Sequence, residues 1–154
     1  ELIEMILSLW KYYRNFDALK KRSMPRIFEA NEIPADEKEV RRDYFDRHSP
    51  RILCESTAKR GEKFRVKIVV GEEYQHPDEG DHYISFIQLW NRETFLAQVH
   101  FTPGMMGGKP GQVEVDFYLV PSVSMNLTAL ANCTKHGLWQ SKQVDVKVID
   151  GLEQ

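Results

Sequence analysis

A cysteine and a histidine near the C-terminus have the spacing of a metal-ligand pair. Cys133 and His136 stand in the stretch "NCTKHGLW", and Cys133 is one of two cysteines in the 154-residue chain. A thiolate and an imidazole are ligands that both zinc and iron accept. Spacing of this kind is a weak signal by itself, because many Cys-x-x-His pairs bind no metal. A metal site would need further ligands from elsewhere in the chain.

Most of the five histidines stand where we expect loops or the ends of strands. His48 lies in "FDRHSP", and His76 and His82 bracket the turn-forming stretch "HPDEGDH". His100, in "AQVHF", lies inside a predicted strand, where we expect it to form hydrogen bonds near the sheet and to bind no metal. Loops at one rim of a β-fold can converge on a single point. The candidate ligands are therefore four imidazoles and one thiolate: His48, His76, His82, His136 and Cys133.

Such a ligand set favours iron over structural zinc. Structural zinc sites usually have four ligands and are richer in sulfur. Four imidazoles and a thiolate suit a square pyramid with one open position, and imidazole is a good ligand for iron. The thiolate pushes electron density onto the metal, so a small oxygen species could bind and be reduced at the open position. The alternative is a set of unrelated surface histidines, and their shared placement in loops argues against it.

The elements that would position these residues follow a period of two from residue 50 onward. Turn-forming stretches such as "KRGEK", "PDEGD" and "TPGMMGGKPG" separate most of the alternating runs. This pattern predicts an all-β domain, an antiparallel β-sandwich of seven strands. One predicted face carries Phe64, Val66, Ile68 and Val70, and another carries Val113, Val115, Phe117 and Leu119. The predicted strands span residues 51–55, 64–70, 82–90, 94–101, 111–120, 124–133 and 143–149.

The first 45 residues have a helical pattern instead. Residues 1–22 have apolar side chains at helical spacing opposite a charged face, which predicts an amphipathic helix. A short second helix is expected over residues 36–45, with Asp36 as its N-cap. We therefore divide the chain into a helical extension, residues 1–45, and a β-sandwich, residues 46–154. An aromatic-rich helix face needs a partner, which could be the sandwich of the same chain or another subunit. We expect another subunit, and therefore a homo-oligomer, either a dimer or a tetramer.

Composition excludes several classes of function. The net charge is −2, with 42% hydrophobic and 29% charged residues, so we expect neither nucleic-acid binding nor association with a membrane. The first residues carry acids where a signal peptide carries bases. Two cysteines make no disulfide framework and cannot supply a four-cysteine site. We therefore expect a cytoplasmic protein.

Three motifs resemble the iron domain of the superoxide reductases, the neelaredoxin and desulfoferrodoxin family. They are "DRHSP" at 46–50, "HPDEGDHYI" at 76–84 and "CTKHGLW" at 133–139. The resemblance covers about residues 46–150 and implies an immunoglobulin-like β-sandwich. It implies one iron per chain, with the four histidines as equatorial ligands and Cys133 as the axial ligand. It further implies an enzyme that reduces superoxide to hydrogen peroxide, with an external donor such as rubredoxin restoring the ferrous state.

The chain departs from the family pattern just before the first ligand histidine. Family members carry Glu-Lys there, whereas this sequence has Asp46-Arg47. In the family the glutamate can cap ferric iron and the lysine assists superoxide binding and protonation. Asp46 is one methylene shorter, and Arg47 is a very weak acid. We expect Arg47 to steer the anion and order water, while water supplies the proton. The alternative for Arg47 is a solvated loop residue.

Two other functions compete with the enzyme. An electron carrier or redox sensor without enzymatic activity could use the same iron site, and the Asp46-Arg47 substitution keeps this alternative open. A protein-interaction module that uses residues 1–45 is a third possibility, which the complete ligand set argues against. Several other side chains have simpler expected roles. Cys54 should pack in the core, Trp139 should pack beneath the site, and Lys59, Lys109 and Lys135 are candidates for a cationic rim.

Overall fold

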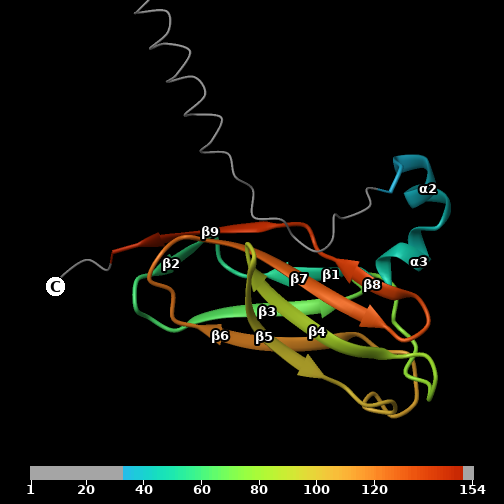
Figure 1. Ribbon diagram of the computed structural model, residues 1–154. Coiled ribbons are helices and arrows are strands. Elements are labelled where there is room, and N and C mark those ends of the chain that lie inside the picture. The colour runs from blue at the N-terminus through green and yellow to red at the C-terminus, as the bar shows by residue number, and fades with distance from the viewer. Residues whose placement is uncertain (1–32, 151–154) are drawn as a thin grey trace, which may run out of the picture.

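Two β-sheets make up most of the part of the chain that this computed structural model describes, residues 33–150 (Figure 1). The smaller sheet has the strand order β1-β3-β6, and the larger has the order β2-β9-β7-β4-β5 with β8 paired to β7. All pairs are antiparallel except β2 with β9. The strands are β1 (Pro50–Leu53), β2 (Thr57–Lys59), β3 (Phe64–Val70), β4 (Ile84–Asn91), β5 (Thr94–His100), β6 (Val113–Leu119), β7 (Met125–Cys133), β8 (Gly137–Gln140) and β9 (Val144–Ile149).

The core lies between the inward faces of the two sheets. Alternate residues of β3 are buried, as the period of two predicts, and β4 and β7 contribute the facing side chains. The buried residues include Val66, Ile68, Val70, Ile87, Leu89, Leu127 and Ala129. From β6, Val113 is buried, and Val115, Phe117 and Leu119 pack against the core. The predicted all-β sandwich and its two inward faces are confirmed.

Two short strands were not predicted. β2 pairs in parallel with β9, and β8 pairs with the end of β7. β2 has only three residues, and none of the four residues of β8 is buried, so neither strand has a visible period of two. The pairing of β8 matters for the site, because it fixes the turn that joins Cys133 to Gly137.

Two short helices precede the first strand, α2 (Ala35–Val40) and α3 (Arg42–Asp46). The single helix expected over 36–45 is interrupted at Arg41, which has φ −121° and ψ 35°. The prediction of Asp36 as the N-cap is wrong. Pro34 holds that position without a side-chain cap, and Asp36 lies in the first turn, where a carboxylate still favours the helix dipole.

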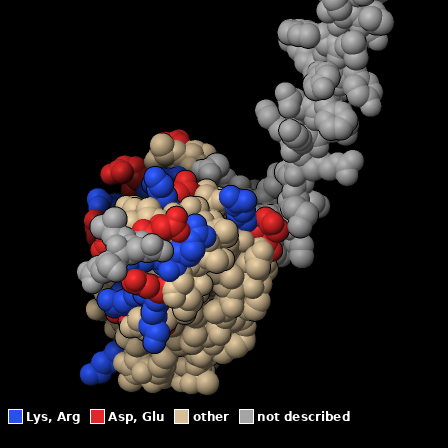
Figure 2. All heavy atoms as spheres, turned by 90° about the vertical axis from the view of Figure 1, so that its left-hand side faces the viewer, with Lys and Arg blue, Asp and Glu red and all other residues tan. Residues whose placement is uncertain are grey.

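The amphipathic helix predicted over residues 1–22 lies outside the described residues, and the division of the chain at residue 45 stays a prediction. α3 runs directly to the site, because it ends at Asp46. Within residues 33–150, neither helix is long and apolar enough to cross a bilayer. On the face drawn in Figure 2, basic and acidic side chains are interspersed and form no patch of a single sign.

Candidate metal centre

Five side chains from distant parts of the chain meet at one end of the sandwich. His48 follows α3, and His76 and His82 lie in the connection between β3 and β4. Cys133 is the last residue of β7, and His136 lies in the turn before β8. Figure 1 shows these elements together at its right-hand side. The structure thus brings together all five of the ligands that were predicted from the sequence.

The potential ligand atoms are close enough to share one ion. Those of His48, His76, His82 and Cys133 all lie within 4.8 Å of one another. His136 joins them through Nδ1, which is 2.9 Å from Nε2 of His48 and 3.5 Å from Sγ of Cys133. Two ligands at right angles, each about 2.1 Å from a shared metal, lie about 3 Å apart. The contacts therefore have the spacing of ligands around a single ion.

The four imidazole rings form a square. Ring centroids are 5.0 Å apart for His48–His76 and for His76–His82, 4.8 Å for His82–His136 and 4.6 Å for His136–His48. Neighbouring rings are nearly perpendicular, whereas the opposite pair His48 and His82 differ by only 21°. Sγ of Cys133 is 3.3 Å from Nε2 of His76 and 3.5 Å from Nδ1 of His136, which are opposite corners. The sulfur therefore lies near the axis of the square.

Backbone carbonyl groups fix two of the rings in the tautomer that a metal needs. Nδ1–H of His48 donates to the carbonyl of Tyr44 at 2.5 Å, and Nδ1–H of His76 donates to the carbonyl of Pro77 at 2.7 Å. Because a carbonyl can only accept, Nε2 of each ring is left with a free lone pair. Nε2 of His82 is buried with no hydrogen-bond partner. An unpartnered buried nitrogen costs free energy unless a ligand occupies it.

Burial also keeps these rings neutral. Desolvation by burial, with a smaller contribution from the neighbouring imidazoles, lowers the pKa of His48 to about 4 and that of His76 to about 4. The pKa of His82 is lowered too, chiefly by burial. A metal binds only the neutral form of imidazole, so lowered pKa values favour binding at neutral pH.

Exposure is unequal around the cluster. His48 and His76 are 0% exposed and Cys133 is 1% exposed, whereas His136 is exposed and His82 is half-buried. The sulfur therefore lies on the protein side, and solvent reaches the cluster from the side of His136. This arrangement fits a centre with a protected thiolate and an accessible open position.

An aromatic group packs against the cluster. Trp139 stacks on His48 with ring centroids 5.1 Å apart and planes 18° apart, and its Nε1–H donates to the carbonyl of His136 at 3.1 Å. Tyr44 contacts both His48 and His136, at 4.8 Å and 5.2 Å between centroids. The sequence indicated packing by Trp139 but not by Tyr44, which lies four residues before His48 on α3.

Asp46 and Arg47 have partners outside the cluster. Oδ2 of Asp46 accepts backbone N–H groups at 2.8–3.0 Å from residues 72–74. The guanidinium of Arg47 donates to the carboxylate of Asp43 at 2.8 Å and to its carbonyl at 3.0 Å. Arg47 is still near enough that its charge contributes to the lowered pKa of His76. The catalytic roles predicted for Asp46 and Arg47 stay predictions.

Asp78 is a buried carboxylate that the sequence reading did not single out. It is 5% exposed and accepts backbone N–H groups from Gly104, Met106 and Gly108, in the loop between β5 and β6. The signal available in the sequence was weak: an aspartate between two candidate ligands, and a glycine-rich loop with no strand pattern.

Most of the remaining candidates have partners outside the cluster, although Lys135 is near enough that its charge contributes to the lowered pKa of His82. His100 contacts Gln98 and the ring of Phe86 on β5 and β4, and Cys54 is half-buried against the core. Two of the candidate rim lysines form ion pairs, Lys135 with Asp81 at 3.0 Å and Lys59 with Glu62 at 3.8 Å. Lys109 is exposed in the loop before β6.

Residues 36–142 match the family model described as desulfoferrodoxin. This segment includes all five residues of the cluster and both sheets apart from β9. The match therefore covers the site and most of the described fold.

Several curated proteins and solved structures are similar over the same region. The superoxide reductase of Pyrococcus furiosus is 32% identical over 110 residues, 63% of this chain and 86% of that protein. The superoxide reductase of Thermococcus kodakarensis is 30% identical over 105 residues, 63% of this chain and 85% of that protein. A variant of the superoxide reductase (neelaredoxin) from Ignicoccus hospitalis superposes with a TM-score of 0.59 at 30% identity. The superposition covers 77% of this chain and 89% of that one.

Proposed function

The chain belongs to the desulfoferrodoxin family, and on that premise we propose that it is a superoxide reductase with one iron per chain. The observation that carries the proposal is the square of four imidazoles with the sulfur of Cys133 near its axis. His48, His76, His82 and His136 would hold the iron from the four corners of the square, and Cys133 would hold it from near the axis. The similar proteins that are named superoxide reductases support this assignment.

The donor set suits the chemistry. Bound iron would supply the single electron that, with two protons, converts superoxide into hydrogen peroxide. Because the imidazoles are neutral, the net charge of the centre would be that of the metal and the thiolate together, which is positive. The open side would therefore attract an anion. Carbonyl groups of Tyr44 and Pro77 hold two of the rings in place, which raises their basicity as ligands.

Arg47 attracts superoxide toward the exposed side of the cluster. Its charge already acts on His76, and its pairing with Asp43 holds it on α3 beside the site. An arginine is too weak an acid to donate the proton, so ordered water near the guanidinium supplies it. An external one-electron donor, of which rubredoxin is one type, restores the ferrous state. The expected homo-oligomer and cytoplasmic location stay predictions.

An electron carrier or redox sensor without enzymatic activity is the second candidate. One observation favours it: the hydrogen bonds of Asp46 and Arg47 in the described part of the chain go to residues outside the cluster, so neither of these side chains is bonded to a ligand. Both candidates require iron. They differ only in their reaction with superoxide.

The test is to load the full chain with ferrous iron and to record its visible spectrum before and after mild oxidation. The ferrous form is then mixed with superoxide. A superoxide reductase shows about one iron per chain, a visible thiolate-to-ferric absorption band and rapid loss of superoxide with formation of hydrogen peroxide. A carrier shows the iron and the band but reacts slowly with superoxide. Protein that takes up no iron under these conditions would contradict both candidates.

A further inference from the structure

Each of the two fully buried histidines of the cluster has an aspartate two residues away in the sequence. Asp46 lies two residues before His48, and Asp78 lies two residues after His76. Each aspartate accepts three backbone N–H groups from a segment that is distant in the sequence. A carboxylate that collects several backbone N–H groups forms charge-assisted bonds about twice as strong as neutral ones.

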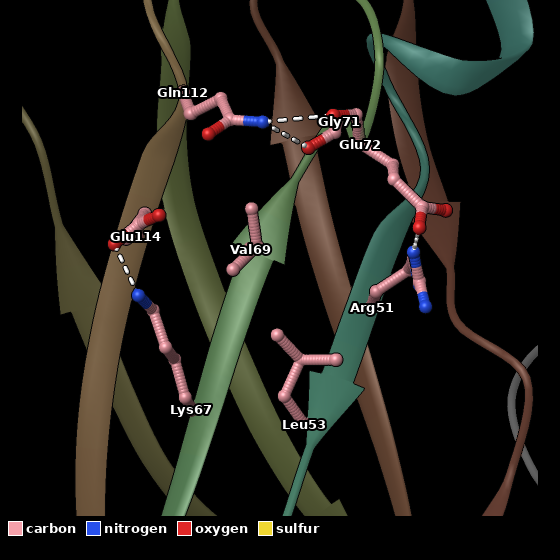
Figure 3. Close-up of a pocket in the computed structure, with 8 residues that line it drawn as sticks. All are labelled: Arg51, Leu53, Lys67, Val69, Gly71, Glu72, Gln112 and Glu114. Atoms are coloured by element: carbon pink, nitrogen blue, oxygen red, sulfur yellow. Dashed lines mark hydrogen bonds and ion pairs between the residues drawn. The ribbon is translucent and has the colours of Figure 1, made fainter.

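Asp46 connects α3 to the turn that follows β3. Its Oδ2 accepts from Glu72 at 3.0 Å, Glu73 at 2.9 Å and Tyr74 at 2.8 Å. Nε2–H of Gln112 donates to the carbonyl groups of Gly71 and Glu72, at 3.3 Å and 3.0 Å, so the same turn is bound from its other side (Figure 3). The turn is therefore a rigid anchor for the end of α3.

The end of α3 in turn sets the position of His48. The ring of His48 donates to the carbonyl of Tyr44, which belongs to this helix. Gly71, with φ 77°, is required by the conformation of the turn, because an added Cβ there would overlap the carbonyl oxygen of Tyr74. Releasing Asp46 from the turn would free the segment that carries both the ring and its carbonyl partner.

Asp78 performs the same task for His76. Its carboxylate accepts from Gly104 at 3.0 Å, Met106 at 2.6 Å and Gly108 at 3.2 Å. His76 exchanges two backbone hydrogen bonds with Gly111, both at 2.9 Å, so the segment 76–78 is bound to the β5–β6 loop at both ends. The carbonyl of Pro77, between them, orients the ring of His76.

We infer that Asp46 and Asp78 are positioning residues, each of which holds one buried ligand histidine in place by binding a distant loop. This inference rests on the proposed function, since it takes His48 and His76 as metal ligands. For Asp46 it replaces the capping role that the resemblance implied. Its Oδ2 already accepts three N–H groups, and contact with the metal would break them.

Binding of Co²⁺ to the metal-free full chain tests the inference. Co²⁺ serves as the probe because its thiolate band and ligand-field bands report both affinity and geometry. We expect Asp46→Ala and Asp78→Asn each to weaken Co²⁺ binding roughly 10- to 100-fold, the usual effect of losing groups that orient metal ligands. The ligand-field bands should shift as well. Asp116→Asn is the matched control, because Asp116 pairs with Arg65 on the surface of the small sheet.

Two further measurements separate positioning from general loss of stability. Circular dichroism selects a temperature at which each variant is folded, and affinity is compared there. Amide hydrogen exchange of the metal-free protein should accelerate at residues 72–74 in Asp46→Ala and at 104–108 in Asp78→Asn. A folded variant that keeps wild-type Co²⁺ affinity and an unshifted spectrum would overturn the positioning role of that aspartate.

Further outcomes separate the positioning role of the two aspartates from the proposed function. If Asp78→Asn does not fold, Asp46→Ala decides by the same criteria, with Asp78→Glu as the milder variant for the second site. A weakened affinity with unchanged amide exchange in both variants would overturn the mechanism through the loops. Wild-type protein that binds Co²⁺ without a thiolate band would contradict the proposed function and this inference with it. Unchanged Co²⁺ binding in the variants, beside a wild-type thiolate band, would contradict the inference alone.

Discussion

Two polar regions of the molecule follow opposite rules. On the outer face of the small sheet, charges meet opposite charges: Lys67 pairs with Glu114 at 2.5 Å and Arg65 with Asp116 at 2.8 Å. Figure 3 shows the Lys67–Glu114 pair beside Val69 and Leu53, together with the pair of Arg51 and Glu72. We call these ion-paired residues of β1, β3, β6 and the adjoining turn the charged surface. All of its side chains keep contact with water.

The histidine cluster has the reverse character. Its nitrogen atoms and sulfur face one another, with no acid side chain between them, and Nε2 of His82 has no partner. Polar atoms buried in this way lower the free energy of unfolding, whereas paired surface charges change it little. The difference teaches that the unfavourable arrangement marks the functional site, because a sequence retains it only where a ligand compensates.

Among changes to the two regions, removing the sulfur of Cys133 should have the largest effect on function. Cys133→Ser removes the only thiolate of the cluster, so the thiolate-to-ferric band should disappear and superoxide reduction should fall to background. Absorption spectra and superoxide kinetics of the iron-loaded protein measure both. Cys54→Ser is the matched control and should leave both unchanged, since Cys54 packs against the core. A Cys133→Ser protein that retained the band would contradict the axial assignment.

Lowering the pH should destabilise the metal-free protein through its buried rings. The pKa values of His48 and His76 are about 4 in the folded state, against 6.5 for the ordinary group. Between these pH values the two rings bind protons in the unfolded chain but not in the folded chain. Their contribution to the free energy of unfolding is therefore fully present above pH 6.5 and is lost as the pH drops toward 4. The free energy of unfolding should fall by up to about 3 kcal/mol per ring.

Urea denaturation of the metal-free protein at several pH values measures this slope. The double variant His48→Gln/His76→Gln should show a flatter dependence between pH 6.5 and 4. His100→Gln should keep the wild-type slope, because His100 is exposed on β5. An equal slope in the wild type and the double variant would show that other groups cause the acid sensitivity.

Removing the charge of Arg47 should reduce the rate with superoxide by a smaller amount. Arg47→Ala should slow the reaction roughly tenfold at low salt, with a weaker dependence on ionic strength, because steering by a single charge is screened by salt. Stopped-flow kinetics at several salt concentrations tests this. Arg42→Ala is the control on the same helix, since Arg42 pairs with Glu73. An unaltered rate and salt dependence in Arg47→Ala would remove the steering role.

Breaking a pair on the charged surface should have the smallest effect. Lys67→Met should change the free energy of unfolding by less than about 1 kcal/mol, the usual limit for an exposed ion pair. Metal binding should remain as in the wild type. Chemical denaturation and Co²⁺ titration measure the two quantities. A loss of metal affinity would mean that the charged surface and the cluster are coupled.

The main strands and the residues of the cluster were predictable because they depend on local patterns. The period of two identified seven of the nine described strands, and the short motifs around His48, His76, His82 and Cys133 identified the side chains that meet in the cluster. β8 could not be predicted, since Gly137–Gln140 becomes a strand only by pairing with β7. The break at Arg41 was missed because both halves of 35–46 have ordinary helical composition.

The supports of the site were not predictable for a different reason. Asp46 and Asp78 make their bonds to backbone N–H groups more than twenty residues away, and such bonds leave no side-chain pattern. The position of Tyr44 against His136 likewise depends on the angle at which α3 meets β8. Sequence reading identified which groups can bind a metal, but not what holds them.

The hairpin that joins β7 to β8 has a consequence for the denatured ensemble. In the native structure Cys133 pairs with Gly137 across a three-residue turn. Cys133 and His136 are only three residues apart in the sequence, so they remain near neighbours in any conformation of the chain. His48, by contrast, is 88 residues away from His136. The unfolded protein therefore keeps a bidentate chelate, and metal bound to it subtracts from the stabilisation that metal confers on the native state. The melting temperature should then rise less with metal concentration than the native affinity alone implies.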